Sequence, residues 1–504
     1  AMEILRKLRQ YAKTDRTAIV YGEKTLSYRD LNAWSDAFAA FLAEKQPESK
    51  APVLLYGHKD LEIPACMFGC LKAGRGYIPV DVTYPPERVA QIETMAKPGL
   101  VVDFTGTLRT PCLSLSRLRE ILKEKAEAAP EENWLKEDET AYILFTSGST
   151  GTPKGVQITA GNLAAFHEGV KPWFEKMQEG GAFLNEISYS FDVSVCALYE
   201  ALGRGMTLWT ADLQTLSNPK ALFALLKEAN LTDWVSTPSL AELCVQSESF
   251  RRDLMPKLRQ FLFCGEVLTK KLCGEIFERF PGVPVVNAYG PTETTVLVTG
   301  AEMTRDMLEA TEPLPIGFAF SNCEANICDE AGNALPDGEA GELRISGKTV
   351  SPGYLGRPDL NARVFFENAV GLRGYRTGDL CKRIDGCIYY LGRLDNQIKL
   401  NGFRVELEDV ENNLGKVENV ARAAVLPETQ DGKVVSLTAY VLLEKPDGEG
   451  SLQRARRIRK ELSRLVPSYM VPRRSSRWSR FPSTRMAKLT KNDCANNAQR
   501  RRRV

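Results

Sequence analysis

The sequence has few histidines and no long apolar run. Only His58 and His167 occur among 504 residues, and no convincing Ser–His–Asp-type triad can be built around either. No stretch approaches the ~18 consecutive apolar residues of a membrane-spanning helix. The charged first 16 residues lack the apolar core and the small-residue site of a signal peptide. We therefore expect a protein that is not embedded in a membrane and that works in the cytoplasm, with both histidines in structural roles.

The twelve cysteines lack the paired spacing of a zinc site. The nearest pairs, such as Cys66 and Cys70, do not form a Cys-x-x-Cys set. In a chain of this length we interpret them as reduced core residues. The composition, 43% hydrophobic and 26% charged with 38 Gly and 27 Pro, is that of a globular protein and excludes disordered, collagen-like and coiled-coil chains.

A net charge of +2 hides an uneven distribution. Residues 451–504 contain 17 Lys and Arg against 2 Asp and Glu, whereas the preceding 450 residues contain 49 against 62. The basic end carries no recognisable RNA- or DNA-binding motif, so we do not expect nucleic acid as a partner.

Short strand-like runs alternate with helical patterns over most of the chain. The capping pattern Ser27-x-x-Asp30 predicts the start of a helix with an apolar stripe. Buried strands are predicted at 52–57, 76–80, 99–104, 141–145 and 261–265, and helices at 218–229 and 269–280. This alternation predicts an α/β fold with substantially parallel sheets.

The pattern changes after about Asp395. A helix is predicted near 406–415, strands near 420–426 and 434–443, and a helix near 452–465. We therefore predict two domains: a large N-terminal domain of α/β subdomains over 1–394, and a small mobile α+β domain over 395–504, whose tail is atypical from about 475.

A Gly/Ser/Thr loop follows the apolar run 141–145. It reads TSGSTGTPKG over 146–155. A flexible linker is the alternative interpretation, but the loop lies between two apolar runs, and glycine amides, hydroxyls and Lys154 together favour a phosphate cradle. The pattern is not that of the nucleoside-triphosphatase P-loop. A near match at 341–349 has one intervening residue too many and lies in a strand-like run.

Four motifs in a fixed order make the sequence similar to the adenylate-forming superfamily of acyl-CoA synthetases, luciferases and peptide-synthetase adenylation domains. They are TSGSTGTPKG (146–155), NAYGPTE (287–293), YRTGD (375–379), and GRLDNQIK (392–399) leading to GFRVE (402–406). The resemblance covers essentially 1–472. It implies that ATP activates a carboxylate with release of pyrophosphate, and that a thiol then takes the acyl group. A carboxylate is already a nucleophile, so positioning and charge stabilisation suffice.

The resemblance implies ATP and Mg²⁺ as cofactors and a role for each matching residue in phosphate binding. Thr146 and Ser147 would contact phosphate oxygens, and Lys154 would belong to a mobile phosphate loop. Thr292 would hydrogen-bond the α-phosphate, and Glu293 would hold Mg²⁺, a hard cation suited to carboxylate oxygen.

The later motifs would bind the nucleoside. Tyr289 would stack on adenine, and the amide of Asn287 would meet the edge of the base. Asp379 would accept hydrogen bonds from the ribose diol, and Arg393 would face the ribose or the phosphates. Further ATP contacts are expected from the neighbouring residues Ala288, Gly290, Pro291, Tyr390, Leu391 and Gly392.

The C-terminal part contributes two expected functional positions. By resemblance, Asp395 is the hinge about which the small domain rotates between the half-reactions. Lys488 falls at the position of the lysine that bridges the substrate carboxylate and phosphate, although Met486-Ala487 replaces the Asn-Gly of the family and Thr490 its Asp. The alternative is that the altered tail is misread or frame-shifted coding sequence.

The substrate pocket resembles that of the amino-acid-activating branch. In SFDVS (190–194), Asp192 would pair with the substrate ammonium; its alternative role is a helix N-cap. Other segments resemble the members of the family that load D-alanine onto a carrier protein: 56–58, 74–81, 183–185, 234–239 and 261–268. By that resemblance Cys264 and Val296 line a small pocket, and Cys264 helps to select D- over L-alanine. Cys264 is equally compatible with a small apolar core residue.

The resemblance thus implies a monomeric ligase that forms D-alanyl-AMP and transfers D-alanine to the phosphopantetheine thiol of a separate carrier protein, for D-alanylation of (lipo)teichoic acid in the cell wall. Two alternatives stay open. One is a stand-alone amino-acid adenylating enzyme of peptide-synthetase type; the other is a non-catalytic nucleotide-binding protein with a degraded C-terminal end.

Overall fold

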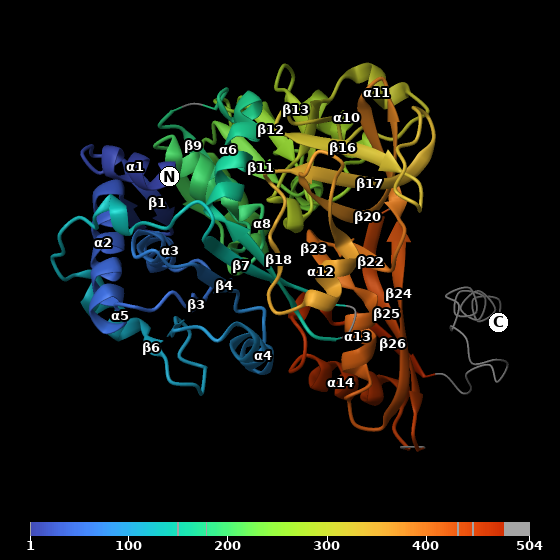
Figure 1. Cartoon of the computed structure of the whole chain (residues 1–504). Helices are drawn as coiled ribbons and strands as arrows, with labels where there is room; N and C mark the ends of the chain where they lie inside the picture. Colours follow the sequence, from blue (N-terminus) through green and yellow to red (C-terminus); the bar gives the residue numbers. More distant parts are fainter. Residues whose placement is uncertain (1, 149–150, 178, 431–432, 446–447, 478–504) are drawn as a thin grey trace. The chain divides into compact units, whose positions relative to one another are not determined.

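The computed structural model describes residues 2–148, 151–177, 179–430, 433–445 and 448–477. The chain divides into two compact units (Figure 1). Unit 1 comprises residues 1–82, 92–145 and 154–395, and unit 2 comprises 83–91, 146–153 and 396–504. Unit 2 thus includes two short segments from far upstream of its main part.

Unit 1 contains a nine-stranded sheet. Its strands are β1 (Thr17–Tyr21), β2 (Lys24–Ser27), β9 (Ala182–Asn185), β10 (Thr207–Thr210), β11 (Asp233–Ser236), β12 (Gln260–Phe263), β13 (Val285–Tyr289), β14 (Thr299–Glu302) and β15 (Phe318–Ala319). The spatial order is β15-β14-β13-β12-β11-β9-β10-β1-β2. The run from β13 to β1 is parallel, and β2, β14 and β15 pair antiparallel at the edges.

A seven-stranded sheet belongs largely to the same unit. Its strands are β3 (Val53–Tyr56), β4 (Tyr77–Val80), β5 (Leu100–Asp103), β6 (Leu113–Ser114), β7 (Thr140–Thr146), β8 (Lys154–Thr159) and β18 (Gly353–Tyr354). The order is β18-β8-β7-β4-β3-β5-β6, parallel from β7 to β6. The parallel strands β3, β4, β5 and β7 are almost wholly buried, as strands covered on both faces are.

A third sheet is antiparallel throughout. It consists of β16 (Cys323–Cys328), β17 (Ala340–Gly347), β19 (Phe365–Glu367), β20 (Arg373–Ile384) and β21 (Cys387–Arg393). The sequence analysis did not predict this sheet. It did place the rejected P-loop-like segment 341–349 in a strand, and most of that segment lies in β17.

Helices precede or follow most of these strands. They are α1 (Glu3–Tyr11), α2 (Tyr28–Lys45), α3 (Glu62–Lys72), α4 (Pro86–Ala96), α5 (Leu115–Leu122), α6 (Ala160–Phe174), α7 (Leu213–Leu216), α8 (Pro219–Ala229), α9 (Pro238–Cys244), α10 (Lys270–Arg279), α11 (Arg305–Glu309) and α12 (Pro358–Val364). Four single-turn elements join them: the 3₁₀-helices η1 (Glu131–Asn133), η3 (Arg252–Leu254) and η4 (Thr292–Thr294), and the π-helix η2 (Cys196–Ala201). Ser27 caps α2 as predicted, because its hydroxyl accepts from the amide of Asp30 at 3.0 Å.

Unit 2 has its own core. The hairpin β22 (Gln397–Leu400) and β23 (Phe403–Glu406) leads into α13 (Leu407–Leu414). The long strands β24 (Val420–Gln430) and β25 (Lys433–Leu443) pair antiparallel, and β26 (Arg474–Arg477) adds in parallel beyond α14 (Ser451–Leu462). A 3₁₀-helix, η5 (Ser468–Met470), precedes β26. Buried aliphatic residues of α13, α14 and the strands fill the core, among them Val405, Val410, Val425, Ile458 and Leu462.

The prediction of an α/β fold with substantially parallel sheets is confirmed. Each predicted strand and helix is present within a few residues of its expected position. In the part of the chain that the structure describes, no helix is long and apolar enough to cross a membrane.

Candidate active site

Three of the sequence motifs meet around one carboxylate in unit 1. The hydroxyl of Tyr289, at the end of β13, donates to Oδ2 of Asp379 on β20. Nη1 of Arg393, paired opposite on β21, donates to Oδ1 of Asp379 at 2.9 Å. Burial raises the pKa of Tyr289, and the charge of Asp379 adds to the effect, so the phenol stays protonated as a donor. The structure therefore brings Tyr289, Asp379 and Arg393 together.

The other predicted nucleoside residues flank this cluster. Asn287 is buried on β13, and its amide nitrogen donates to the carbonyl of Pro315 at 2.8 Å, which leaves its orientation fixed. Ala288 lies between Asn287 and Tyr289 on the same strand. On β21, Tyr390, Leu391 and Gly392 immediately precede Arg393. Leu391 is exposed, and burial raises the pKa of Tyr390.

A strained turn follows Tyr289. A Cβ at Gly290 would lie 2.3 Å from the carbonyl oxygen of Val296, so only glycine permits this close approach. Pro291 precedes η4, after which Thr295 and Val296 both have a positive φ, 61° and 69°. A β-branched residue in the left-handed region is costly and is found mainly where function requires it. Val296 is buried there, as a pocket residue would be.

Glu293 is a completely buried carboxylate in η4. Its Oε1 accepts a hydrogen bond from the hydroxyl of Tyr354 at 2.6 Å, and its backbone oxygen accepts from Ser351 at 2.8 Å. Thr292 beside it is also buried. The ammonium of Lys154 lies 5.5 Å from the centre of the Tyr354 ring, a cation–π contact.

This donor set fits Mg²⁺ of a metal–nucleotide complex. Among the described residues no group of three or more His, Cys, Asp or Glu could hold a metal ion. Mg²⁺ is typically bound by one or two carboxylates, with phosphates and waters supplying the other ligands. A single oriented carboxylate, Glu293, is therefore sufficient if a nucleotide supplies the rest.

Asp192 and Cys264 are both buried in unit 1. Burial raises the pKa of the Cys196 thiol, and the electrostatic effects of Cys264, Glu200 and Asp192 add to this rise. Cys196 opens η2, and π-helical turns of this kind occur frequently at functional sites. Val195, and not Asp192, occupies the N-cap position of η2. The sequence analysis assigned no role to Cys196, since nothing local distinguishes it from the other cysteines.

The described part of the phosphate loop is held within unit 2. The hydroxyl of Ser147 donates to the carbonyl of Arg404 at 3.1 Å and accepts from the amide of Glu406 at 3.0 Å. Oγ1 of Thr146 is buried and has no hydrogen-bond partner among the described residues. An orphaned hydroxyl at this position suits a phosphate oxygen. Residues 149–150 lie outside the described residues.

A buried ion pair supports this loop. Arg88 and Asp409 are paired at 2.7 Å, Arg88 also donates to the carbonyl of Gly151 at 3.0 Å, and Asp409 accepts from the amide of Gly148 at 3.3 Å. The sequence analysis assigned no role to Arg88 or Asp409, which lie 321 positions apart.

Asp395 and Lys488 complete the predicted set. Asp395, the last residue of unit 1, forms a two-point ion pair with Arg393, with N–O distances of 2.9 and 2.5 Å. Lys488 lies outside the described residues.

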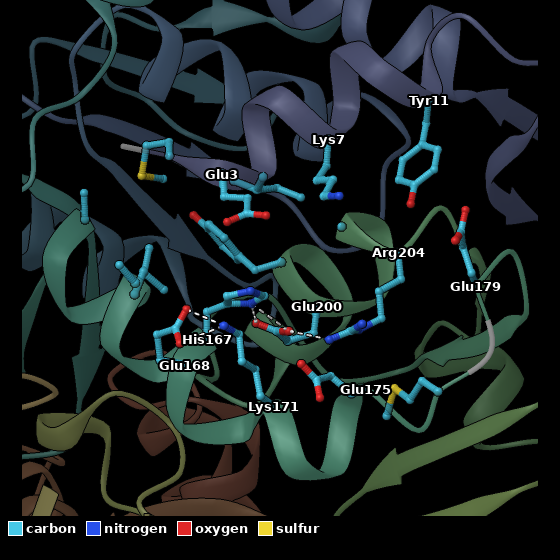
Figure 2. Close-up of a pocket in the computed structure, with 18 residues that line it drawn as sticks. Glu3, Lys7, Tyr11, His167, Glu168, Lys171, Glu175, Glu179, Glu200 and Arg204 are labelled. Atoms are coloured by element: carbon cyan, nitrogen blue, oxygen red, sulfur yellow. Dashed lines mark hydrogen bonds and ion pairs between the residues drawn. The ribbon is translucent and has the colours of Figure 1, made fainter. Parts of the chain in front are cut away.

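The two histidines are tied to carboxylates. Nδ1 of His58 lies 2.6 Å from Oδ2 of Asp81, and Nδ1 of His167 lies 2.9 Å from Oε1 of Glu200. Figure 2 shows the second pair, with Arg204 beside it, in a pocket of unit 1 between α1, α6 and the η2 segment. None of the predicted site residues lines this pocket.

Comparison with known proteins identifies the class. Residues 7–355 match the model of the AMP-binding enzyme family, and residues 409–488 match that of the AMP-binding enzyme C-terminal domain. The chain therefore belongs to the AMP-binding enzyme family. Its members couple ATP to adenylate formation, and the chain is an adenylate-forming ligase.

Comparison with individual relatives is more specific. The chain is 38% identical over 495 residues to the D-alanine–D-alanyl carrier protein ligase of Bacillus cereus (strain B4264), covering 97% of this chain and 98% of the relative. It is 40% identical over 481 residues to the ligase of the same name from Listeria monocytogenes serovar 1/2a, covering 93% of each.

Solved structures share the fold. The adenylation domain AlmE of Vibrio cholerae, solved with glycyl-adenosine-5'-phosphate, superposes with a TM-score of 0.81 at 23% identity, covering 98% of this chain and 97% of AlmE. PA1221, a protein with adenylation and PCP domains, gives 0.83 at 25% identity, covering 98% and 84%.

Proposed function

We propose that the chain activates D-alanine as D-alanyl-AMP and transfers it to the phosphopantetheine thiol of a separate carrier protein, for D-alanylation of (lipo)teichoic acid. The burial of Asp192 and Cys264 carries the proposal, because Asp192 offers a buried anion for an ammonium and Cys264 a small side chain for a small substrate. Full-length similarity to D-alanine–D-alanyl carrier protein ligases supports it.

The first half-reaction joins the D-alanine carboxylate to the α-phosphate of ATP and expels pyrophosphate. Tyr289 stacks on adenine, and Asp379 accepts the ribose hydroxyls between the fixed donors Tyr289 and Arg393. Thr292 donates to the α-phosphate. Asn287, Ala288, Gly290, Pro291, Tyr390, Leu391 and Gly392 complete the nucleoside pocket.

The phosphates need cationic and hydroxyl partners. Thr146, Ser147 and Lys154 supply them, and Glu293 holds Mg²⁺, which neutralises phosphate charge when bound. Lys488 bridges the substrate carboxylate and the α-phosphate. The match to the C-terminal family model ends at residue 488 and so includes this lysine, which supports its equivalence.

The selectivity for an amino acid over a fatty acid follows from the burial of Asp192. An ammonium that leaves water is stabilised only by a close anion, so a buried Asp192 disfavours fatty acids that lack one. Cys264 and Val296 limit the side chain of the substrate to a methyl group, and they favour the D over the L configuration.

In the second half-reaction the carrier thiolate attacks the acyl carbonyl, and AMP leaves. A large domain over 1–394 and a small one over 395–504, hinged at Asp395, serve the two half-reactions in turn. The ligase acts as a monomer in the cytoplasm, where ATP is available.

ATP–pyrophosphate exchange with D-alanine, L-alanine, glycine and propionate tests this proposal. We expect exchange to be fastest with D-alanine, and D192N to raise the KM for D-alanine strongly while exchange stays measurable and the KM for ATP is kept. D103N, at another buried aspartate of unit 1, is the control. C264A is expected to narrow the preference for D- over L-alanine, and C273A, at another buried cysteine, should not.

Exchange that is fastest with propionate would overturn the role of Asp192. Nucleotide binding without exchange would favour a non-catalytic protein.

A further inference from the structure

The segment that carries Asp192 has no regular structure of its own. Residues 186–192 run from the end of β9 to the turn before η2 without belonging to a strand or helix. Its local backbone bonds are few, such as the amide of Phe191 donating to the carbonyl of Ser188 at 3.0 Å. A loop of this kind holds a side chain precisely only if other elements fix it.

Lys59 fixes the start of this segment. It follows β3 in the seven-stranded sheet and is 2% exposed. Its ammonium donates to Oδ1 of Asn185 at 2.9 Å and to the carbonyl of Ile187 at 2.5 Å, and it lies 4.0 Å from the centre of the Tyr189 ring. The burial lowers the pKa of Lys59 to about 7, against the opposing charges of Glu186 and Asp81.

Asp81 fixes the middle of the segment. It follows β4, beside β3, and is also 2% exposed. Its Oδ2 accepts from the hydroxyl of Ser188 at 2.9 Å and lies 2.6 Å from Nδ1 of His58. The hydroxyl of Ser188 in turn lies 2.9 Å from that of Ser190, two residues before Asp192.

Two polar side chains at the ends of two parallel strands of one sheet, Lys59 and Asp81, thus contact a loop that extends from another sheet, and His58 contacts Asp81. An apolar contact would pack the loop at lower cost, because burying these charges is expensive. Directional hydrogen bonds give a single geometry instead.

The geometry points to His58, Lys59 and Asp81 as positioning residues, which hold residues 185–190 so that Asp192 meets the substrate ammonium. This inference rests on the proposed function, in which Asp192 binds that ammonium. It adds a specificity role for His58, Lys59 and Asp81.

The experiment compares S188A and K59M with wild type in ATP–pyrophosphate exchange. The loss of a hydrogen bond to a carboxylate predicts a rise in the KM for D-alanine of roughly tenfold in S188A. We expect a larger rise in K59M, and an unchanged KM for ATP in both. K72M is the matched control, because Lys72 is another buried lysine of unit 1, paired with Asp36 at 2.7 Å and not in contact with the segment.

A double-mutant cycle distinguishes an effect that acts through Asp192 from a general loss of loop structure. If the contacts act through Asp192, S188A should change the KM for D-alanine little in a D192N background. A D-alanine KM for S188A equal to that of wild type, or an effect of S188A that is undiminished in D192N, would overturn the inference. S188A removes one hydroxyl and leaves the buried charges in place, so this outcome does not depend on K59M folding.

Failure of the proposed function gives a different result. D192N would then leave the KM for D-alanine unchanged, or wild type would show no exchange with D-alanine. Neither outcome resembles a selective loss in S188A and K59M.

Discussion

The hydroxyl of Tyr354 donates a 2.6 Å hydrogen bond to the buried carboxylate of Glu293. Tyr354 lies on β18 of the seven-stranded sheet, and Glu293 lies in η4, which follows β13 of the nine-stranded sheet. A residue of one sheet therefore orients a side chain beside a strand of the other. The hydrogen bond thereby orients the carboxylate that we propose holds Mg²⁺.

Removing this hydroxyl should weaken Mg²⁺ binding. Loss of a hydrogen bond to a metal ligand typically costs 10–100-fold in affinity, so Y354F should raise the Mg²⁺ concentration for half-maximal exchange about tenfold. Titration of exchange with Mg²⁺ at fixed ATP checks this. Y28F is the control, since the buried Tyr28 also makes a 2.6 Å hydrogen bond, to the carbonyl of Met206. Equal Mg²⁺ requirements for Y354F and Y28F would contradict the role of Glu293.

Asp379 should affect the KM for ATP and not the KM for D-alanine. D379N keeps the shape of the side chain but removes the negative charge that Tyr289 and Arg393 face. We expect the KM for ATP to rise about tenfold or more, and the KM for D-alanine to stay unchanged. D337N, which breaks an exposed ion pair with Arg383, is the control. A rise in the KM for D-alanine of equal size would indicate a general loss of structure instead.

His167 should make stability depend on pH. The hydrogen bond to Glu200 raises the pKa of His167 above 6.5, so the pair stabilises the fold fully below that value. The contribution is lost as pH rises through the native pKa. H167Q should therefore lower Tm by about 2 °C near pH 6 and by less near pH 9.

Thermal unfolding at both pH values measures this effect. K171Q, which breaks an exposed pair with Glu168, should give the same Tm difference at both. A decrease in Tm for H167Q that is larger near pH 9 than near pH 6 would show that the predicted pH dependence has the wrong direction.

Lys488 should act in the first half-reaction only. A positioned cation at a developing charge is worth about 10²–10³ in rate, so K488Q should lower exchange by about that factor. Transfer from pre-formed D-alanyl-AMP to the carrier should be nearly normal. K491Q is the control from the same tail. Wild-type exchange in K488Q would assign the lysine no role.

Local sequence patterns were sufficient for most elements. The apolar runs 141–145 and 261–265 are β7 and β12, since a short apolar run bounded by turn residues can be buried as a parallel strand. The helix cap at Ser27 was predicted from Ser27 and Asp30 alone. The motif order was sufficient to assign the family.

Contacts between distant segments could not be predicted. His58 and Asp81 pair across two strand ends, and Arg88 meets Asp409 in unit 2. No periodicity or capping signal reports such a pairing, because it depends on which strands become neighbours.

Transfer of radiolabelled D-alanine to a phosphopantetheine-bearing D-alanyl carrier protein tests the central claim most directly. We predict ATP-dependent label on the carrier that hydroxylamine releases, absent with the carrier that lacks phosphopantetheine, and outcompeted by unlabelled D-alanine but not by L-alanine. No label on the phosphopantetheine-bearing carrier, or label outcompeted better by L-alanine or glycine, would contradict the account.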